Sequence, residues 1–417
     1  MDVMYEVVCG LDVHKETVVA CVAELRSKKT TREVRTFEAH TRGLHEMREW
    51  LRQRGVEVVV MEGTGIYWRP VYAVLEAGDA KWKLVVGNAH HVKNVPGRKT
   101  DVKDAEWLAS LAQYGLIRPS FVPPPAIREL RDLTRYRKKL VEDRSRQRAR
   151  VLKVLQAANI KLDGVASDAF GVSGMLMLRA LAAGEKTPKE MASLAKGSLK
   201  QKMDALEIAL EGMLGEVHRG MLTVALGVLD HFDEALEQVD ALIDAKVKPW
   251  EDAIGRMTSI PGFDRVMAVA VLAELGPDMT VFPTEHHCAS WAGVCPGNNE
   301  SAGKSRDGRP RRGNPYLKTM LCQAAQSAVR TKRTYLKDKF HRLKARRGHN
   351  KAIMAIAHKL VVSVFHILKG NTTYKDLGAT WLDSRDRARV VRGLVDRLQA
   401  LGYDATLREH SVPGTQA

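Results

Sequence analysis

Two carboxylates three residues apart stand at the start of a predicted helix. Asp101 and Asp104 precede residues 105–112, a run of good helix formers with an apolar stripe. Positions i and i+3 share one helix face, so both carboxylates can point at a common spot. Hard oxygen ligands in this arrangement suit Mg²⁺. Taken alone, however, the pair favours a helix cap, because acids at the N-cap and in the first turn are a common capping pattern.

Two further acids lie near the ends of predicted strands. Asp12 is on the first strand, and Glu62 follows residues 57–61, a continuous apolar run. Chemistry in open α/β sheets gathers outside the carboxyl ends of strands, and an acid in an apolar strand is costly to bury unless it binds a cation. Asp12 alone could equally be a surface acid. The four acids Asp12, Glu62, Asp101 and Asp104 together predict a two-metal site for phosphoryl transfer.

A serine with a suitable neighbourhood lies far downstream. Ser301 is in a predicted loop of small and polar residues that leads directly into a basic run. A serine held among cations can attack a phosphodiester, because Lys and Arg stabilise the developing charge. Most serines are solvated loop residues, so only the neighbourhood distinguishes Ser301. Ser290 and Ser305 are close enough in sequence to be alternatives.

The positive charge of the chain is concentrated in two stretches. The net charge is +17 and the pI about 9.7, which favours a nucleic-acid partner first and an anionic membrane second. Residues 128–153 hold eleven Lys and Arg against four acids, and residues 304–347 hold fifteen against two. The first stretch could equally be a solvated helix face. The predicted nucleic-acid contacts are Arg135, Arg137, Lys138, Lys139, Lys304, Arg306, Arg309, Arg311 and Arg312.

Composition excludes several other classes of protein. No apolar run of about 18 residues predicts a membrane-spanning helix. The first residues lack the basic and apolar regions of a signal peptide. The five cysteines form no CxxC pair, so they indicate free thiols in a reducing compartment and neither a zinc site nor a disulfide framework. We therefore expect a cytoplasmic location and no membrane partner.

The predicted elements divide the chain into four regions. Strands at residues 6–13, 17–23, 32–37, 57–61 and 82–86, with helices at 44–51 and 68–75, predict a mixed α/β sheet over residues 1–122. Three prolines close that region. The others are a helical or coiled-coil linker and dimerisation region at 123–252, an α-helical C-terminal domain at 253–375 and a peripheral extension at 376–417.

Helical patterns organise the second half of the chain. Residues 127–155 predict one long helix, typical of a projecting or coiled-coil arm. Residues 158–174 are predicted to be a loop, and further helices follow over 175–248. Residues 259–264 form a Pro-Gly turn before another helix, a pattern that resembles a helix-hairpin-helix element whose backbone N–H groups bind DNA phosphates.

Five short segments resemble the insertion-sequence-110 family of transposases. Residues 10–15 (GLDVHK), 61–65 (MEGTG) and 99–105 (KTDVKDA) are similar to its RuvC-like DEDD domain. Residues 291–296 (WAGVCP) and 300–304 (ESAGK), together with the helical-hairpin segment from Ile260, are similar to its C-terminal transposase domain. The segments occur in the family's order, which makes the resemblance specific.

The resemblance implies a fold, a site and partners. It implies an RNase H-like sheet in which Asp12, Glu62, Asp101 and Asp104 bind Mg²⁺, and it implies that Ser301 attacks DNA to form a phosphoserine link. It further implies homodimers assembling to homotetramers, in which RuvC-like and serine elements of different subunits meet at one DNA strand. Double-stranded donor and target DNA and a structured guide RNA are the implied partners, in the bacterial cytoplasm with the nucleoid.

Two other functions fit parts of the sequence. A RuvC-like Holliday-junction resolvase or nuclease would use the same acids with metal-activated water and would form no covalent link to DNA. A non-enzymatic architectural protein with a helix-hairpin-helix element would be indifferent to EDTA and to loss of the acids. We expect the transposase.

Overall fold

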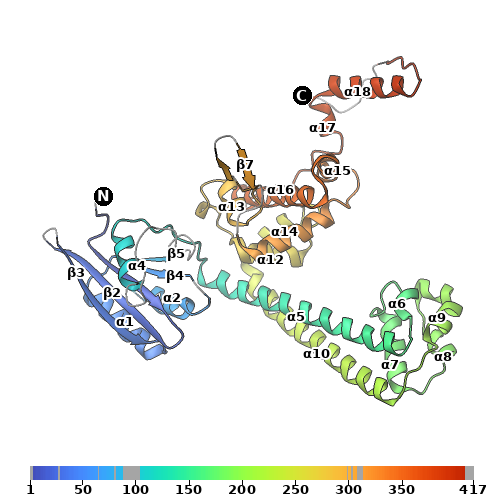
Figure 1. The fold of residues 1–417 in the computed structure, drawn as a ribbon, viewed down its shortest axis with the longest axis horizontal. Coiled ribbons are helices and arrows are strands. Elements are labelled where there is room, and N and C mark those ends of the chain that lie inside the picture. Colours follow the sequence, from blue (N-terminus) through green and yellow to red (C-terminus); the bar gives the residue numbers. More distant parts are fainter. Residues whose placement is uncertain are drawn as a thin grey trace. The chain divides into compact units, whose positions relative to one another are not determined.

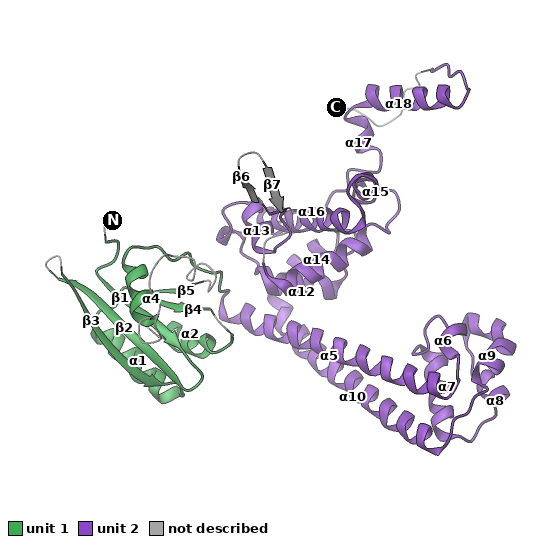
Figure 2. Ribbon diagram, in the orientation of Figure 1, with its two compact units in different colours: residues 1–122 green, residues 123–417 purple. Residues whose placement is uncertain are grey.

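The computed structural model describes residues 3–26, 29–63, 65–78, 81–87, 104–297, 299–301, 304–307 and 313–408, with the backbone alone at 299–301 and 304–307. The chain forms two compact units, residues 1–122 and residues 123–417 (Figure 2). Separate clusters of buried apolar side chains lie within each unit. We describe each unit by itself.

Unit 1 is built on a five-stranded mixed sheet with strand order β3-β2-β1-β4-β5 (Figure 1). The first three strands pair antiparallel, and β4 lies parallel to both β1 and β5. The strands follow the β-branched runs of the sequence, which confirms the predicted mixed sheet. Their bounds are β1 (Val7–Val13), β2 (Thr17–Arg26), β3 (Lys29–Glu38), β4 (Val58–Glu62) and β5 (Lys83–Gly87).

Helices cover both faces of this sheet. On one face, α1 (Thr41–Gln53) and α2 (Trp68–Glu76) pack against alternate residues of β1 and β4, such as Leu11 and Met61. On the other face, α4 (Asp104–Gln113) packs against the residues in between. Successive strand residues point to opposite faces, so one strand serves both layers. The sequence predicts a helix that opens near Asp101; the described part of this helix begins at Asp104.

Two long helices form the arm of unit 2. They are α5 (Pro125–Ala157) and α10 (Glu216–Val247), which lie side by side (Figure 1). Pro125 starts α5, where its missing N–H removes no helical hydrogen bond. On α10, buried apolar residues recur every seven positions, at Leu222, Leu229, Leu236 and Ile243, and this spacing gives one continuous packing seam.

The far end of the arm is capped by short helices. They are α6 (Leu162–Val165), α7 (Val172–Ala183), α8 (Pro188–Ala192), the 3₁₀ segment η2 (Gly197–Lys202) and α9 (Met203–Leu210). The prediction of a loop over residues 158–174 is therefore wrong in part, because α6 and the start of α7 lie there. Leu162 is fully buried in this cap, but a helix of four residues is too short for its periodicity to be read.

A helical bundle surrounds α16 (His349–Gly370). This helix contacts α11 (Glu251–Met257), α13 (Glu285–Trp291), α14 (Pro315–Ala328) and α15 (Tyr335–Arg347), while α12 (Arg265–Leu275) contacts α5, α11 and α14. Among the described residues, α16 alone is long and apolar enough to cross a bilayer by length and composition. Ten of its residues are buried, as expected of the central helix of a bundle.

The bundle also carries a two-stranded sheet that the sequence does not predict. β6 (Asn299–Ser301) pairs antiparallel with β7 (Lys304–Asp307), so Ser301 is on a strand and the predicted open loop is wrong at this point. Strands of three and four residues with polar side chains show no alternation of apolar and polar residues. These strands can be identified only from their pairing with each other in the structure.

The C-terminal extension is attached through its first residues. The Asp376 carboxylate accepts a hydrogen bond from the Tyr335 backbone N–H at 3.0 Å, and Trp381 of α17 (Trp381–Ser384) packs edge-on against the Tyr335 ring. Beyond it, α18 (Arg387–Ala400) is described over its whole length and has no buried residue. Asp376 and Trp381 of the extension therefore contact the bundle, whereas α18 buries none of its residues.

Candidate active site

The parallel pairing of β1 and β4 sets Asp12 beside Glu62. The register pairs Gly10 with Val60 and Leu11 with Met61, so Asp12 and Glu62 occupy the next position on each strand. Both acids are on the face that α4 covers, because they continue the alternation from Gly10 and Val60. Glu62 is the last residue of β4. The two carboxylates therefore leave the carboxyl ends of neighbouring parallel strands on one side of the sheet.

Gly10 brings α4 close enough to add a third acid. A Cβ atom at position 10 would lie 2.2 Å from the Ala105 carbonyl oxygen and 2.4 Å from the Ala109 nitrogen. The helix backbone therefore rests directly on β1, and only glycine leaves room for it. Asp104 is the first residue of α4 in the described part of the chain, so this close packing holds its carboxylate near the ends of β1 and β4.

The electrostatics of Asp12 show that the three acids interact. Burial raises the pKa of the Asp12 carboxyl, whose side chain is 20% exposed. The charge of Asp104, and less strongly that of Glu62, raises this pKa further. His14 lowers it, since its Nε2 lies 3.1 Å from Asp12 Oδ2. Like charges this close destabilise one another, and a cation among them would relieve the repulsion.

The described acids fit a divalent cation in chemistry, but they do not form a complete site by themselves. Carboxylate oxygens are the ligands that Mg²⁺ prefers. Within the described residues, no group of three or more His, Cys, Asp or Glu is arranged to hold a metal ion. The structure thus places Asp12 and Glu62 at the ends of neighbouring strands and Asp104 at the start of the described part of α4, and Asp101, the fourth predicted ligand, lies outside the described residues.

His14 is a neighbour of the site that the sequence analysis missed. It follows β1, two residues after Asp12, and its ring bonds the Asp12 carboxylate. The signal was present in the sequence, because residues two apart at a strand end point the same way. A hydrogen bond of this kind fixes the orientation of a carboxylate.

The serine candidates lie in unit 2. Ser301 is the last residue of β6 and Ser305 is on β7, and the structure describes only their backbones. Ser290 lies on α13. Cys21 and Cys288 are weaker nucleophile candidates, because burial raises the pKa of Cys21 to about 11 and that of Cys288 to about 12.

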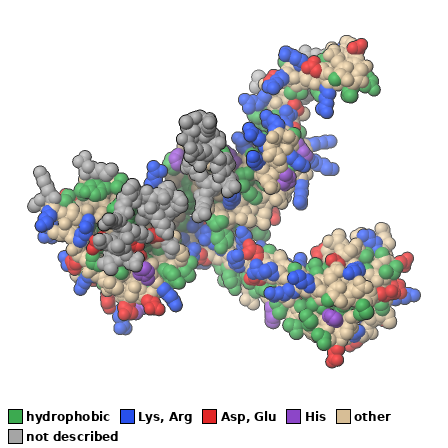
Figure 3. Space-filling model, viewed as in Figure 1, with side chains coloured by type: hydrophobic (Ala, Val, Ile, Leu, Met, Phe, Trp, Pro, Cys, Tyr) green, Lys and Arg blue, Asp and Glu red, His purple; other side chains and the backbone are tan. Residues whose placement is uncertain are grey.

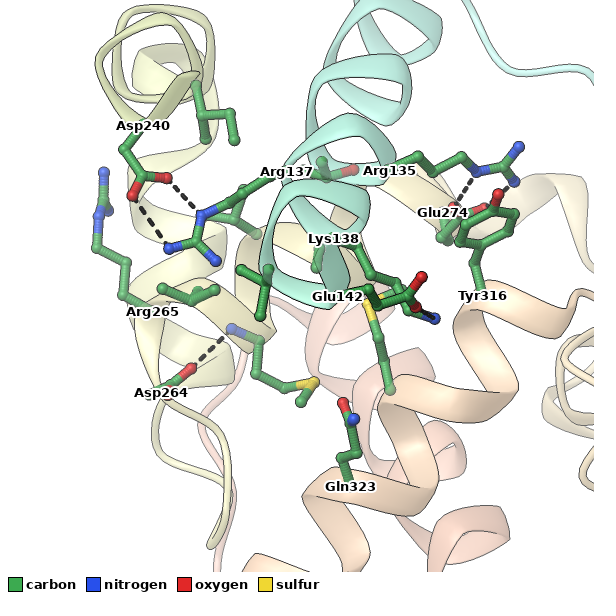
Figure 4. Close-up of a pocket in the computed structure, with 18 of the residues that line it drawn as sticks. Arg135, Arg137, Lys138, Glu142, Asp240, Asp264, Arg265, Glu274, Tyr316 and Gln323 are labelled. Atoms are coloured by element: carbon green, nitrogen blue, oxygen red, sulfur yellow. Dashed lines mark hydrogen bonds and ion pairs between the residues drawn. The ribbon is translucent and has the colours of Figure 1, made fainter. Parts of the chain in front are cut away.

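The first basic stretch is largely paired within the chain. Arg135 makes a bidentate ion pair with Glu274, and Arg137 pairs with Asp240 of α10 (Figure 4). These guanidinium groups already have carboxylate partners, which the sequence could not show. Lys138 lies 5.1 Å from the centre of the Tyr316 ring. The predicted nucleic-acid contacts of this stretch stay a prediction.

A cavity of about 420 Å³ lies beside these ion pairs, between α5, α10, α12 and α14 (Figure 4). Its wall includes Val141, Ile243, Val266, Met267 and Met320. It lies wholly in unit 2, whereas the carboxylates belong to unit 1. Asp12, Glu62 and Asp104 therefore do not line this cavity.

The second basic stretch keeps cations exposed on α15 and before it. Figure 3 shows Lys and Arg side chains gathered over α15. Exposed described cations of the stretch are Arg330, Lys332, Arg333, Lys344, Arg346 and Arg347. Of the predicted contacts, Lys304 and Arg306 are on β7 with only their backbones described, and Arg309, Arg311 and Arg312 lie outside the described residues.

The predicted helix-hairpin-helix turn has a structural reason for its glycine. Gly262 has a φ of +86°, and a Cβ there would lie 2.5 Å from the Ala324 carbonyl oxygen of α14. Asp264 caps α12 by accepting a hydrogen bond from the Met267 N–H. The turn therefore packs against α14, and this contact accounts for the glycine at position 262.

Comparison with known proteins defines the class. A family model for the DEDD-type domain of IS110 elements, described as a transposase, matches residues 9–160, which include α4 and the five-stranded sheet from the third residue of β1 onward. A model described as "Transposase IS116/IS110/IS902 family" matches residues 255–341 in the bundle. The sheet with acids at its strand ends and the helical bundle thus correspond to the two parts of a transposase. The chain belongs to the IS110 family of transposases.

Individual relatives agree with this assignment. The transposase for insertion sequence element IS1111A of Coxiella burnetii is 31% identical over 34% of this chain and 40% of its own length. An insertion element IS110 protein of Streptomyces coelicolor is 34% identical over 34% of this chain and 34% of its own length. A probable family 20 transposase of Pseudomonas aeruginosa is 25% identical over 79% of this chain and 89% of its own length. The matched segments thus span less than half of the first two relatives.

Proposed function

We propose that this chain is a DNA transposase that cuts and rejoins strands to move its own insertion sequence. The observation that carries the proposal is the convergence of Asp12, Glu62 and Asp104 at one edge of the sheet, within a chain of the IS110 family. Asp101 would complete the acid set. A Mg²⁺ ion held by these carboxylates would stabilise charge on phosphate and sugar oxygens during phosphoryl transfer.

Ser301 would be the nucleophile. Its Oγ would form a bond to the phosphorus of a DNA strand while the bond from phosphorus to a sugar oxygen breaks. The hydroxyl proton leaves Ser301, and the released sugar oxygen takes up a proton. Rejoining reverses these bond changes with a different strand end, so no external energy source is needed. Lys304 and Arg306, close to Ser301 in the chain, are proposed to bind the phosphate.

The proposed DNA partner follows from the charge, and the proposed RNA and assembly follow from the family resemblance. Double-stranded donor and target DNA would contact the exposed cations of the second basic stretch. A structured guide RNA would select those DNAs, and homodimers pairing into homotetramers would supply acids from one subunit and serine from another to the same strand. We place the protein with the nucleoid in the bacterial cytoplasm. Support for these partners comes from the family resemblance and from the net charge of +17.

The nucleophile is tested by removing one hydroxyl group. Ser301→Ala should abolish recombination of the element and leave DNA binding intact, because the substitution changes no charge. Ser290→Ala and Ser305→Ala are the matched controls and should recombine normally. Full activity of Ser301→Ala would refute the assignment, and loss of activity in one of the controls would identify the nucleophile instead.

A further inference from the structure

Glu274 is a fully buried glutamate at the C-terminal end of α12, and side chains from two other segments converge on it. Arg135 of α5 donates from Nε and from its terminal amino group to the two carboxylate oxygens, at 2.7 and 2.8 Å (Figure 4). Arg131, one turn earlier on α5, donates to the backbone carbonyls of Ala273 and Glu274 at 3.1 and 2.7 Å. The third partner is Asn314, whose Nδ2 donates to Glu274 Oε2.

Asn314 also lies where the segment that carries β6 and β7 rejoins the helical bundle. Its Oδ1 caps α14 by accepting hydrogen bonds from the Tyr316 and Leu317 N–H groups, at 3.0 and 3.2 Å. Its own N–H donates to the Trp291 carbonyl at the end of α13, at 3.0 Å. The two functions use different atoms of Asn314, so one can be removed without the other.

Two glycines, Gly293 and Gly313, allow the two ends of this segment to lie close together. A Cβ on Gly313 would lie 2.4 Å from the Gly293 nitrogen and 2.7 Å from the Trp291 carbonyl oxygen. The chain therefore leaves and re-enters the bundle at one point, and residues 294–312 lie between. This segment contains β6, β7 and Ser301.

Burying a carboxylate between two helices costs desolvation free energy, so we expect the geometry of such a contact to matter. Apolar side chains of similar volume would join α5 to α12 without the desolvation of three charged groups. Bidentate pairing instead fixes distance and angle together. The Arg135 guanidinium also lies 4.3 Å from the centre of the Tyr316 ring, on the first turn of α14. The arm, α12 and the start of α14 are thus held in one arrangement.

We propose that Glu274 is a positioning residue that links the arm helix α5 to the base of the β6–β7 hairpin and so sets where Ser301 is presented. The proposal rests on the proposed function, in which Ser301 is the nucleophile. Movement of the arm at Arg131 and Arg135 would be transmitted through Glu274 and Asn314 to the hairpin.

The test uses Asn314→Ser in the full-length protein. Serine keeps an oxygen that can cap α14 but lacks the amide Nδ2 that donates to Glu274. Hydrogen exchange of peptides covering residues 289–297 and 313–320 should become faster, while exchange in α15 and α16 stays unchanged. The yield of covalent protein–DNA adduct, on double-stranded DNA carrying the element's own end sequence, should fall on the order of 10-fold to 100-fold, as expected for a reacting group displaced by about 1 Å. DNA binding should be retained.

Two matched variants keep the outcome decisive. Asn371→Ser removes a different hydrogen bond of the same bundle, from Arg256 to Asn371 Oδ1 at 3.0 Å, and should leave the adduct yield unchanged. Arg135→Lys keeps the charge on α5 but loses the bidentate pair, and it should also accelerate exchange at the hairpin base. The link through Glu274 is refuted if Asn314→Ser gives the wild-type adduct yield, or if Arg135→Lys leaves the hairpin base unchanged. If Ser301→Ala still forms adduct, the proposed function fails instead.

Discussion

Gly10 decides whether the carboxylates of unit 1 can meet. The residue lies where the backbone of α4 rests on β1, and the distance of 2.2 Å from its missing Cβ to the Ala105 carbonyl leaves no space for a side chain. Asp12 on the strand and Asp104 on the helix are held together by this contact. Gly10 has no reactive group, but the candidate site depends on it because it allows α4 to approach β1.

Gly10→Ala should separate α4 from β1. We expect a loss of about 1–3 kcal/mol in the free energy of unfolding, typical of overpacking, and a larger relative loss of recombination because Asp104 moves with its helix. Urea unfolding followed by circular dichroism gives the first quantity.

The control for this substitution is Gly255→Ala in α11. A Cβ at position 255 meets no atom within 4 Å, so alanine should stabilise the protein by roughly 0.5–1 kcal/mol through its better helix propensity. Equal changes in the free energy of unfolding for Gly10→Ala and Gly255→Ala would show that the contact of α4 with β1 is not close.

At the scale of elements, apolar patterning allowed the sheet to be predicted but not the hairpin. The strands of unit 1 have β-branched runs, and residues 127–155 have helical periodicity over many turns, so both could be recognised locally. β6, β7 and α6 are too short for either period to be seen. They depend on pairing or burial with distant residues.

The acids of the candidate site could be predicted from the sequence, but the ion-pair partners of the basic residues could not. Asp12 and Glu62 stand out because acids are rare at the end of apolar strands. The partners of Arg135 and Arg137 lie more than a hundred residues away, at Glu274 and Asp240. No local pattern indicates such pairs, so the sequence predicted either nucleic-acid contact or a solvated helix face for these arginines.

The ion pair between α5 and α12 should dominate the attachment of the arm. Arg135→Ala leaves the carboxylate of Glu274, which is fully buried, without its bidentate partner, and should lower the free energy of unfolding by about 3–5 kcal/mol. Arg179→Ala, which breaks the exposed pair with Asp230, should cost less than about 1 kcal/mol. Chemical denaturation of both variants measures the difference, and similar values would contradict the role of the buried pair.

At the scale of the whole molecule, the net charge of +17 predicts strongly salt-dependent binding of nucleic acid. A protein cation that contacts a phosphate releases counterions from the nucleic acid, whereas a protein cation that is paired with an acid of the same chain releases none. Arg346 and Arg347 are exposed at the end of α15, and Arg137 is paired with Asp240. The structure therefore separates two kinds of arginine that the sequence cannot distinguish.

The double substitution of Arg346 and Arg347 by alanine should reduce the slope of log K against log salt concentration by about 1 to 2, since each lost phosphate contact removes nearly one unit. Arg137→Ala should leave the slope unchanged. Fluorescence anisotropy of labelled double-stranded DNA over a range of NaCl concentrations measures both slopes. A change for Arg137→Ala with none for the α15 variant would place the nucleic acid along the arm instead.

The most direct measurement for the whole account is capture of a covalent protein–DNA species on a denaturing gel. With Mg²⁺ present, the wild-type protein should form this species on DNA carrying the element's ends. Ser301→Ala, Asp101→Asn and Asp104→Asn should not form it, and EDTA should prevent it. Cleavage of DNA by the wild-type protein with no covalent species would contradict the account and indicate a nuclease that uses metal-activated water.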